Sequence, residues 1–134
     1  MKNAMSEKDI TERIINAARN PHVHAIGHLT GRLIGRRDAY RVNVSAVIEA
    51  CAEAGTCLEL NAHPERLDIT DVVCRQARKA GVKVALGTDA HNASHYGLML
   101  FGVATARRGW LERRDVINCM TAKQLLKSIR SRKR

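Results

Sequence analysis

The chain has 134 residues and a formal net charge of +10, with 45% hydrophobic and 27% charged residues. These values are typical of one soluble globular domain and exclude a disordered chain. No apolar run approaches the roughly 18 residues of a membrane span, and the polar N-terminus does not resemble a signal peptide, so we expect a cytoplasmic protein. Aromatic residues make up only 3% of the chain, which argues against a platform of stacked rings for single-stranded nucleic acid.

The positive charge is concentrated at one end of the chain. Residues 1–106 hold 13 Lys and Arg against 11 Asp and Glu, a net charge of +2. Residues 107–134 hold 10 Lys and Arg against 2 Asp and Glu, a net charge of +8. A basic end on a nearly neutral body indicates contact with phosphate, in a nucleic acid or another polyanion. A solvated tail at residues 127–134 is the alternative interpretation.

Hydrophobic periodicity and helix-ending residues divide the chain into alternating helices and strands. The expected helices are residues 11–19, 43–54, 69–80, 96–106 and 121–129. The expected strands are residues 22–28, 57–61 and 82–87. Short connections between alternating strands and helices predict parallel strands joined by crossovers, which is an α/β fold. The four cysteines form no CxxC pair, and we expect small buried thiols rather than disulfides.

Polar residues that can bind a metal follow the expected strands. His28 follows the first strand, Asn61 ends the second, and Asp89 and His91 follow the third. In α/β folds, chemistry collects at the carboxyl ends of the parallel strands, which lie side by side. A carboxylate and an imidazole two residues apart can hold a divalent cation. We therefore take His28, Asp89 and His91 as the candidate metal ligands; the alternative for a D-x-H pair is a turn that caps the next helix.

Glu59 and Asn61 lie two residues apart and therefore on one face of the second strand. An interior Glu is costly unless it is paired or hydrogen-bonded, and Arg66 is a candidate partner. Two interpretations stay open for these residues: a buried ion pair that holds the loop, and contact with substrate. His22 and His24 open the first strand, away from its exit, and we interpret them as structural histidines.

A basic loop containing Arg32, Arg36 and Arg37 lies directly after His28, with Arg41 nearby. Guanidinium groups next to a cluster of metal ligands suit phosphate recognition, and a solvated basic loop is the alternative. The chain has no Walker A sequence, no GxGxxG opening a helix, no GxSxG and no HExxH. Metal-assisted hydrolysis of a phosphate ester is the reaction that the remaining residues support.

Four segments carry these motifs: TERIINAARNPHVHAIGHLTGRLIGRRDAY, LELNAHPERLDI, GVKVALGTDAHN and GVATARRGWLERRDVIN. Together they resemble the PHP (polymerase and histidinol phosphatase) domain, in the form found at the C-terminus of bacterial and archaeal family X DNA polymerases. The resemblance covers about residues 10–130, with the motifs in the family's order. It implies part of a distorted, TIM-like β/α barrel with about three parallel strands. Residues 1–10 would be a leader, 11–130 the C-terminal part of the PHP domain, and 131–134 a basic tail.

The resemblance also implies metal-dependent phosphoester hydrolysis with manganese or zinc. In the polymerase-linked members this reaction removes 3′ nucleotides or processes the 3′ ends of DNA. The three candidate metal ligands match ligands of the family, and the three arginines match a basic segment where DNA contact is expected. The sequence departs from the family at Leu29, where the family has proline after the ligand histidine. It departs again at His63, where the family has Asn and where an extra ligand would be placed.

The largest departure is the absence of the family's first motifs, an H-x-H and a Ser-Asp-Gly signature, before Thr11. The chain therefore resembles only the C-terminal half of the barrel. One protein ligand per metal cannot replace a hydration shell, so we expect an incomplete metal site in the isolated chain. A half barrel also leaves sheet edges unpaired. We expect association with a second copy of the chain or with a complementing N-terminal half.

Three functions stay open at this stage. The first is a segment of a PHP exonuclease that acts on DNA in repair. The second is a non-catalytic nucleic-acid or protein-binding remnant that uses residues 107–134, whose binding would need no metal and would weaken steeply with salt. The third is a PHP phosphatase acting on a small phosphorylated metabolite such as histidinol phosphate. No membrane partner is expected.

Overall fold

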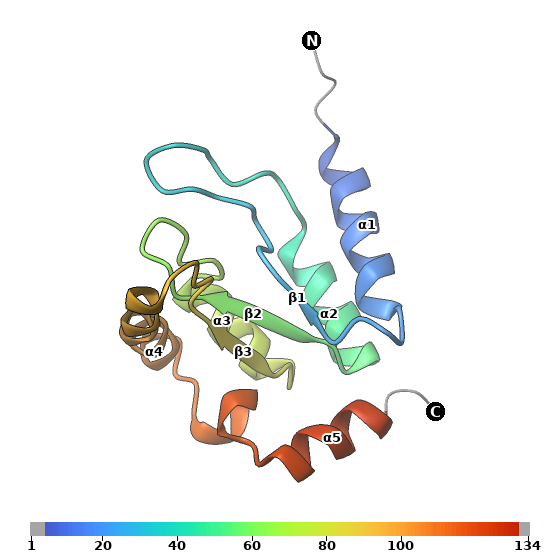
Figure 1. The fold of residues 1–134 in the computed structure, drawn as a ribbon. Helices are drawn as coiled ribbons and strands as arrows, with labels where there is room; N and C mark the ends of the chain where they lie inside the picture. Colours follow the sequence, from blue (N-terminus) through green and yellow to red (C-terminus); the bar gives the residue numbers. More distant parts are fainter. Residues whose placement is uncertain (1–4, 132–134) are drawn as a thin grey trace.

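Three parallel strands form the sheet on which the molecule is built (Figure 1). The computed structural model describes residues 5–131. β1 (Ala25–Ile26) pairs with β2 (Cys57–Asn61), and β2 pairs with β3 (Val84–Gly87), so β2 is the central strand. Both pairs are parallel and the spatial order follows the chain order. These findings confirm the expected α/β class and its three parallel strands, whereas the closure of such strands into a TIM-like barrel stays a proposal.

Five helices connect and flank the strands. They are α1 (Glu7–Arg19), α2 (Val44–Ala54), α3 (Asp71–Lys79), α4 (Met99–Arg108) and α5 (Ala122–Ser131). Three short 3₁₀ segments follow β3, namely η1 (Ala93–Leu98), η2 (Arg113–Asp115) and η3 (Ile117–Cys119). The crossovers between successive strands contain α2 and α3, as the sequence predicts. α1 packs against α2, while α4 contacts α3 and the two strands β2 and β3 (Figure 1).

Capping side chains determine where the helices begin and end. The hydroxyl of Ser6 accepts the backbone N–H of Asp9 at 3.1 Å, and the Asp9 carboxylate accepts the backbone N–H of Ser6. This capping box starts α1 earlier than the Thr11 expected from hydrophobic periodicity. The side chain of Asn43 caps α2 as predicted, and α2 ends at Gly55, which adopts a left-handed φ of 69°.

β1 is shorter than the strand expected over residues 22–28. Before it, the backbone N–H of His22 donates to Oδ1 of Asn20 at 2.9 Å, which holds the chain in a turn after α1. After it, His28 adopts a φ of 49°, and this left-handed residue ends the extended backbone. A turn before β1 and a left-handed residue after it therefore leave two residues, Ala25 and Ile26, in register with β2.

The outer edge of β3 is covered by the segment that follows α4. Val84 forms an isolated parallel bridge with Val116. The side-chain amide of Asn118 donates to the carbonyl of Leu86 at 2.9 Å and accepts its backbone N–H at 2.8 Å. A single side chain thus takes the place that a neighbouring strand would occupy at this point.

The core lies between the sheet and the helices that cover it. The largest fully buried apolar side chains are Leu29, Val47, Cys51, Leu58, Leu60, Ile69, Cys74 and Val84. None of the four cysteines forms a disulfide, and Cys51 and Cys74 are buried as expected. The expectation of buried thiols is wrong for Cys119, which is exposed, and holds only in part for Cys57, which is half-buried. Among residues 5–131, no helix is long and apolar enough to cross a bilayer.

Candidate functional site at the carboxyl ends of the strands

The three parallel strands bring their polar exit residues together at one edge of the sheet. His28 follows β1, Asn61 ends β2, and Asp89 follows β3. Nε2 of His28 lies 3.8 Å from Oδ2 of Asp89, although 61 positions separate them in the sequence. Both residues have a positive φ, 49° for His28 and 53° for Asp89. Left-handed backbone is uncommon outside glycine and is concentrated at functional sites, which supports a functional interpretation here.

The carboxylate of Glu59 fills the space between the ends of the two outer strands. A Cβ atom built on Gly27 would lie 3.0 Å from Oε2 of Glu59, and one built on Gly87 would lie 3.1 Å from Oε1. Two glycines that flank the central strand therefore leave room for this carboxylate at the surface of the sheet. Its side chain is 23% exposed, so it remains partly open to solvent.

Glu59 holds His28 through two contacts. Its Oε2 accepts the backbone N–H of His28 at 3.1 Å and lies 3.3 Å from the imidazole Nδ1. The side-chain Nδ2 of Asn61, which can only donate, lies 3.4 Å from the same Nδ1. Nδ1 therefore has both a carboxylate acceptor and an amide donor within reach, while the other nitrogen, Nε2, faces Asp89.

Arg66 pairs with Asp89, and not with Glu59 as the sequence suggested. Nε of Arg66 lies 3.3 Å from Oδ2 of Asp89, and the two side chains are 22% and 29% exposed. The expectation of a Glu59–Arg66 pair rested on proximity along the chain. It is wrong because the loop after β2 reaches across to the exit of β3, where a carboxylate is already placed.

His91 is held by the backbone of Asp89. Nδ1 of His91 lies 2.7 Å from the carbonyl oxygen of Asp89, and because a carbonyl only accepts, Nδ1 carries the proton. Nε2 of this exposed side chain therefore carries the lone pair. His95, which the sequence reasoning missed, lies against it with ring centroids 6.5 Å apart. The four-residue spacing of His91 and His95 is the feature of the sequence that could have predicted this contact.

His63 does not present a lone pair in the way a metal ligand would. Its Nδ1 accepts the backbone N–H of Glu65 at 3.3 Å, so the proton of the neutral ring lies on Nε2. The ring packs edge-on against His95, with centroids 5.5 Å apart. His63 lines a small cleft of about 140 Å³ together with Leu33, Glu65, Arg66, Asp89 and His91.

Two of the three loop arginines bond to the backbone of their own neighbourhood. The guanidinium of Arg32 donates to the carbonyls of Arg66 and Leu67, the first at 2.6 Å. Arg37 donates to the carbonyl of Gly31 through Nε at 2.9 Å and through a second nitrogen at 2.5 Å. These bonds tie the loop after β1 to the loop after β2.

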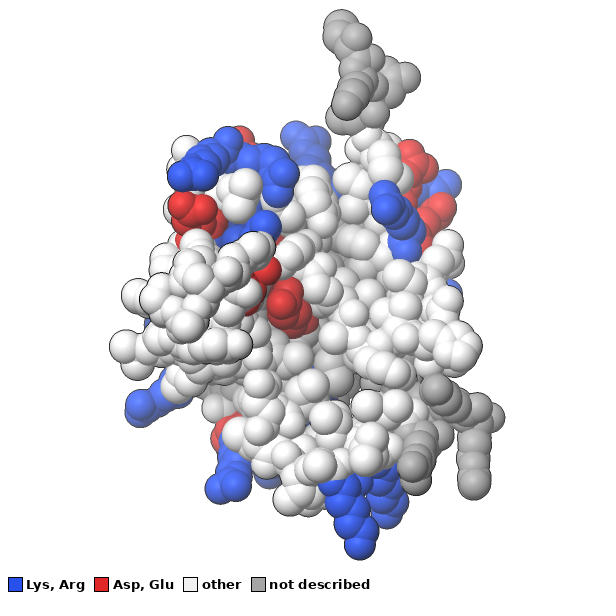
Figure 2. Space-filling model, viewed as in Figure 1, with Lys and Arg blue, Asp and Glu red and all other residues white. Residues whose placement is uncertain are grey.

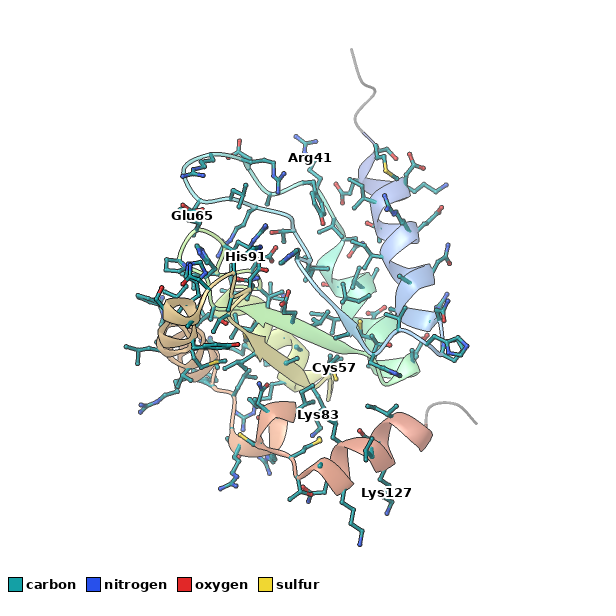
Figure 3. All side chains as sticks on the ribbon, in the orientation of Figure 1. Arg41, Cys57, Glu65, Lys83, His91 and Lys127 are labelled. Carbon is teal, nitrogen blue, oxygen red and sulfur yellow. The ribbon has the colours of Figure 1, made fainter. Side chains whose placement is uncertain are left out.

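Arg36 is exposed and pairs with Glu65 at 3.3 Å on the surface. Figure 2 shows basic side chains gathered at the upper left of the molecule, where Figure 1 draws the loop between β1 and α2. In Figure 3, Glu65 and His91 lie below that loop, at the same edge of the sheet. A basic rim therefore stands beside the histidines and carboxylates.

The donor types suit a divalent metal ion, but their number does not complete a site. Imidazole nitrogens whose other nitrogen is hydrogen-bonded, together with a carboxylate, are typical ligands of zinc and manganese. Within residues 5–131, however, no group of three or more His, Cys, Asp or Glu side chains is arranged to hold a metal ion. His28 and Asp89 therefore provide a partial set, and His91 adds a lone pair beside it.

Comparison with known proteins supplies an independent finding. The chain is 41% identical over 119 residues to the DNA polymerase/3′-5′ exonuclease PolX of Bacillus subtilis, a match that covers 89% of this chain and 21% of PolX. It is 34% identical over 87 residues to a probable phosphatase of Caldanaerobacter subterraneus, covering 60% of this chain and 32% of the phosphatase. A probable phosphatase of Thermoanaerobacter sp. is 33% identical over the same length, covering 60% and 33%. No family model matches the chain. The chain thus spans about a fifth of PolX and about a third of these phosphatases.

Proposed function

From the premise that this chain belongs to the PHP family, in the form carried by PolX-type polymerases, we propose that it forms part of a metal-dependent phosphoester hydrolase acting on the 3′ ends of DNA. The observation that carries the proposal is the approach of His28 to Asp89 across two strand ends, at 3.8 Å. A relative that is a DNA polymerase and 3′-5′ exonuclease supports DNA as the substrate. A role in DNA repair belongs to the same proposal.

The residues have separate tasks in the proposed reaction. Nε2 of His28, the carboxylate of Asp89 and Nε2 of His91 would hold a manganese or zinc ion. Such an ion supplies Lewis acidity toward a phosphate oxygen and lowers the pKa of a water molecule. Glu59 fixes the imidazole of His28 through Nδ1, and Arg66 holds Oδ2 of Asp89, so both ligands are oriented before substrate arrives.

The basic rim is proposed to align the phosphate backbone of the substrate. Arg36 lies on the surface with its side chain 70% exposed, so it can exchange Glu65 for a phosphate. Arg32 and Arg37 would stabilise the loop that carries Arg36, because their guanidinium groups donate to backbone carbonyls. The other candidate substrate contacts touch the proposed ligands themselves: Glu59 and Asn61 contact His28, and Arg66 contacts Asp89.

The remaining ligands are proposed to come from outside the described residues. Because the matched region is about a fifth of PolX, a complementing N-terminal half or a second copy of the chain would complete both the metal site and a TIM-like barrel. β1 offers the edge for this. The carbonyl of His24 accepts the N–H of Cys57, so the backbone N–H and C=O of the exposed Ala25 point away from β2.

The test is a complementation assay on a 3′-labelled DNA oligonucleotide with Mn²⁺. The chain is mixed with Bacillus subtilis PolX from which the matched region has been removed. We expect metal-dependent release of 3′ nucleotides from the mixture. His28→Ala should strongly reduce this release. His22→Ala, which replaces an exposed histidine before β1, should leave it unchanged. Failure of the mixture to release nucleotides, or equal activity of both variants, would overturn the proposal.

A second candidate is a phosphatase that acts on a small phosphorylated metabolite. It is favoured by the probable phosphatases that match 60% of the chain. The same complemented chain would then release phosphate from histidinol phosphate faster than nucleotides from DNA, and the ratio of the two rates decides between the candidates.

A third candidate is metal-independent binding of nucleic acid by the basic end. Arg107, Arg113, Lys123 and Lys127 are exposed, and within residues 5–131 they form no ion pair with a carboxylate, which leaves their charges available to phosphate. Addition of a chelator separates this candidate from the first two. Binding through these residues would persist in the chelator and fall steeply with salt, whereas hydrolysis would stop.

A further inference from the structure

The main chain of His28 is held on both sides by side chains from other segments. Its N–H donates to Oε2 of Glu59 at 3.1 Å. Its carbonyl accepts the phenol hydroxyl of Tyr40 at 3.0 Å and the backbone N–H of Gly31 at 3.0 Å. A left-handed residue with a positive φ persists only where its surroundings fix it. The peptide groups on either side of His28 are therefore both fixed by side chains, one by a carboxylate and the other by a phenol.

Tyr40 packs against the turn after His28, whose carbonyl its hydroxyl binds. Its backbone N–H donates to the carbonyl of Thr30 at 3.0 Å. Its ring lies so close to Gly31 that a Cβ atom built there would come within 2.1 Å of Cε1 of Tyr40. Gly31 also has a φ of 61°, so both the ring and the backbone require glycine at this position. The loop between β1 and α2 thus returns to its own start and closes on the His28 turn.

The opposite side of the same turn is fixed by Asp68. Its Oδ2 accepts the backbone N–H groups of Thr30 and Gly31 at 2.9 and 3.0 Å, and the Thr30 hydroxyl at 3.0 Å. Leu29, between these residues and His28, is fully buried. The turn from His28 to Gly31 is therefore held by burial and hydrogen bonds. The carbonyl of His28 is held by the hydroxyl of Tyr40, a residue that is 39% exposed, and by the backbone N–H of Gly31, which Oδ2 of Asp68 shares.

We propose that Tyr40 is a further positioning residue of the site, whose hydroxyl holds the His28 carbonyl and thereby helps to keep Nε2 of His28 directed at Asp89. The inference rests on the proposed function, in which His28 is a ligand, but it concerns the orientation of the ring and not the reaction. Loss of the hydroxyl would leave the carbonyl with one donor, the Gly31 N–H that Oδ2 of Asp68 shares, so the peptide after His28 would be held less firmly. The ring would then sample more than one orientation relative to Glu59 and Asp89.

The chain offers a matched pair of variants, because Tyr40 and Tyr96 are its two tyrosines. Tyr40→Phe removes the hydroxyl and keeps the ring on Gly31. Tyr96→Phe makes the same change on η1, where the side chain is 71% exposed. Both variants are read in the full chain by imidazole ¹H–¹⁵N correlation spectra, which report the tautomer and mobility of each histidine without a metal.

We expect His28 to give one set of signals in the unaltered chain and in Tyr96→Phe, and averaged or broadened signals in Tyr40→Phe. In the complemented chain, Mn²⁺ binding to Tyr40→Phe should weaken about fivefold, the factor expected for the loss of one net hydrogen bond. Unchanged His28 signals in Tyr40→Phe would overturn the inference even if the metal assay succeeds. If Tyr40→Phe alters the His28 signals but the unaltered chain binds no metal, the inference about Tyr40 stands and the proposed function is contradicted.

A measurement on the unaltered chain tests the inference even if the Tyr40→Phe variant does not fold. The aromatic protons of Tyr40 should show nuclear Overhauser effects to the Hα protons of Gly31. Their absence would show that the ring does not lie on the turn, which would equally overturn the inference.

Discussion

Arg66 and Asp89 form an ion pair that joins the loop after β2 to the exit of β3, with 3.3 Å between Nε and Oδ2. The same carboxylate oxygen faces Nε2 of His28 at 3.8 Å. One oxygen therefore lies between a guanidinium that orients it and an imidazole that would share a metal with it. This geometry indicates that Arg66 orients a proposed metal ligand, a role that its position in the sequence does not predict.

Removal of this guanidinium should affect the site more than the fold. We expect Arg66→Ala to lower Mn²⁺-dependent hydrolysis by the complemented chain about tenfold or more, and to lower the free energy of unfolding by about 1 kcal/mol, as for a partly exposed ion pair. Arg36→Ala, which breaks an exposed pair with Glu65, is the control for stability. Urea unfolding and nucleotide release measure the two effects. A stability loss of several kcal/mol in Arg66→Ala would identify a structural role in place of the proposed one.

The space beside Glu59 makes Gly27 a second test position. A methyl group on Gly27 would lie 3.0 Å from Oε2 of Glu59, so Gly27→Ala must displace the carboxylate that holds His28. We expect a loss of about 1 kcal/mol in unfolding free energy, the lower end for overpacking, because the displaced oxygens end a flexible and partly exposed side chain. Gly97→Ala is the matched control, since a methyl group there would have no atom within 4 Å and the φ of Gly97 is not positive. Equal thermal stability of the two variants would contradict the tight fit around Glu59.

Burial raises the pKa of the Cys74 thiol from 9.0 to about 12, and the nearby carboxylate of Asp71 adds to the rise. The fully buried side chain should therefore resist iodoacetamide at pH 8, while the exposed Cys119 is alkylated, as mass spectrometry of the digested chain would show. Comparable alkylation of both thiols in the native chain would contradict the buried placement of Cys74.

The same shift has a consequence for stability at high pH. A thiol whose pKa is higher in the folded than in the unfolded chain stabilises the fold fully below pH 9, and this contribution is lost as the pH rises through about 12. The difference in unfolding free energy between the unaltered chain and Cys74→Ala should shrink over that interval. A difference that stays constant from pH 8 to pH 11 would show that the thiol does not titrate differently in the two states.

The outward N–H of Ala25 allows the proposed edge pairing of β1 to be blocked without disturbing the sheet. Proline is tolerated on an edge strand where the missing N–H would face solvent. We expect the unaltered chain to associate at high concentration in sedimentation velocity, and Ala25→Pro to remain a folded monomer. A monodisperse monomer of the unaltered chain at high concentration would count against pairing with a second copy and leave the complementing half as the partner.

The sequence predicts the parts of the fold that depend on local periodicity. Alternating helices and strands with short connections predict a parallel sheet, and the sheet brings His28 and Asp89 together because the carboxyl ends of parallel strands share one edge. The cap of α2 at Asn43 and its end at Gly55 follow from single residues. These features need no knowledge of how distant loops pack.

The partners of individual side chains could not be predicted, because they depend on how two loops cross. Arg66 reaches Asp89 only after the loop behind β2 folds toward β3, and no spacing encodes that direction. Tyr40 returns to His28 across a loop whose path is set by Gly31 and Asp68. The short β1 likewise results from the hydrogen bond at Asn20 before it and the left-handed backbone of His28 after it, neither of which hydrophobic periodicity registers.

Metal binding is the most direct test of the central proposal that His28 and Asp89 belong to one metal site. The chain, complemented by Bacillus subtilis PolX lacking the matched region, is equilibrated with Mn²⁺, and bound manganese is measured by mass spectrometry. We expect manganese to be retained by the unaltered chain and by His22→Ala, and to be lost on either His28→Ala or Asp89→Ala. Equal manganese in all four preparations would contradict the proposed site.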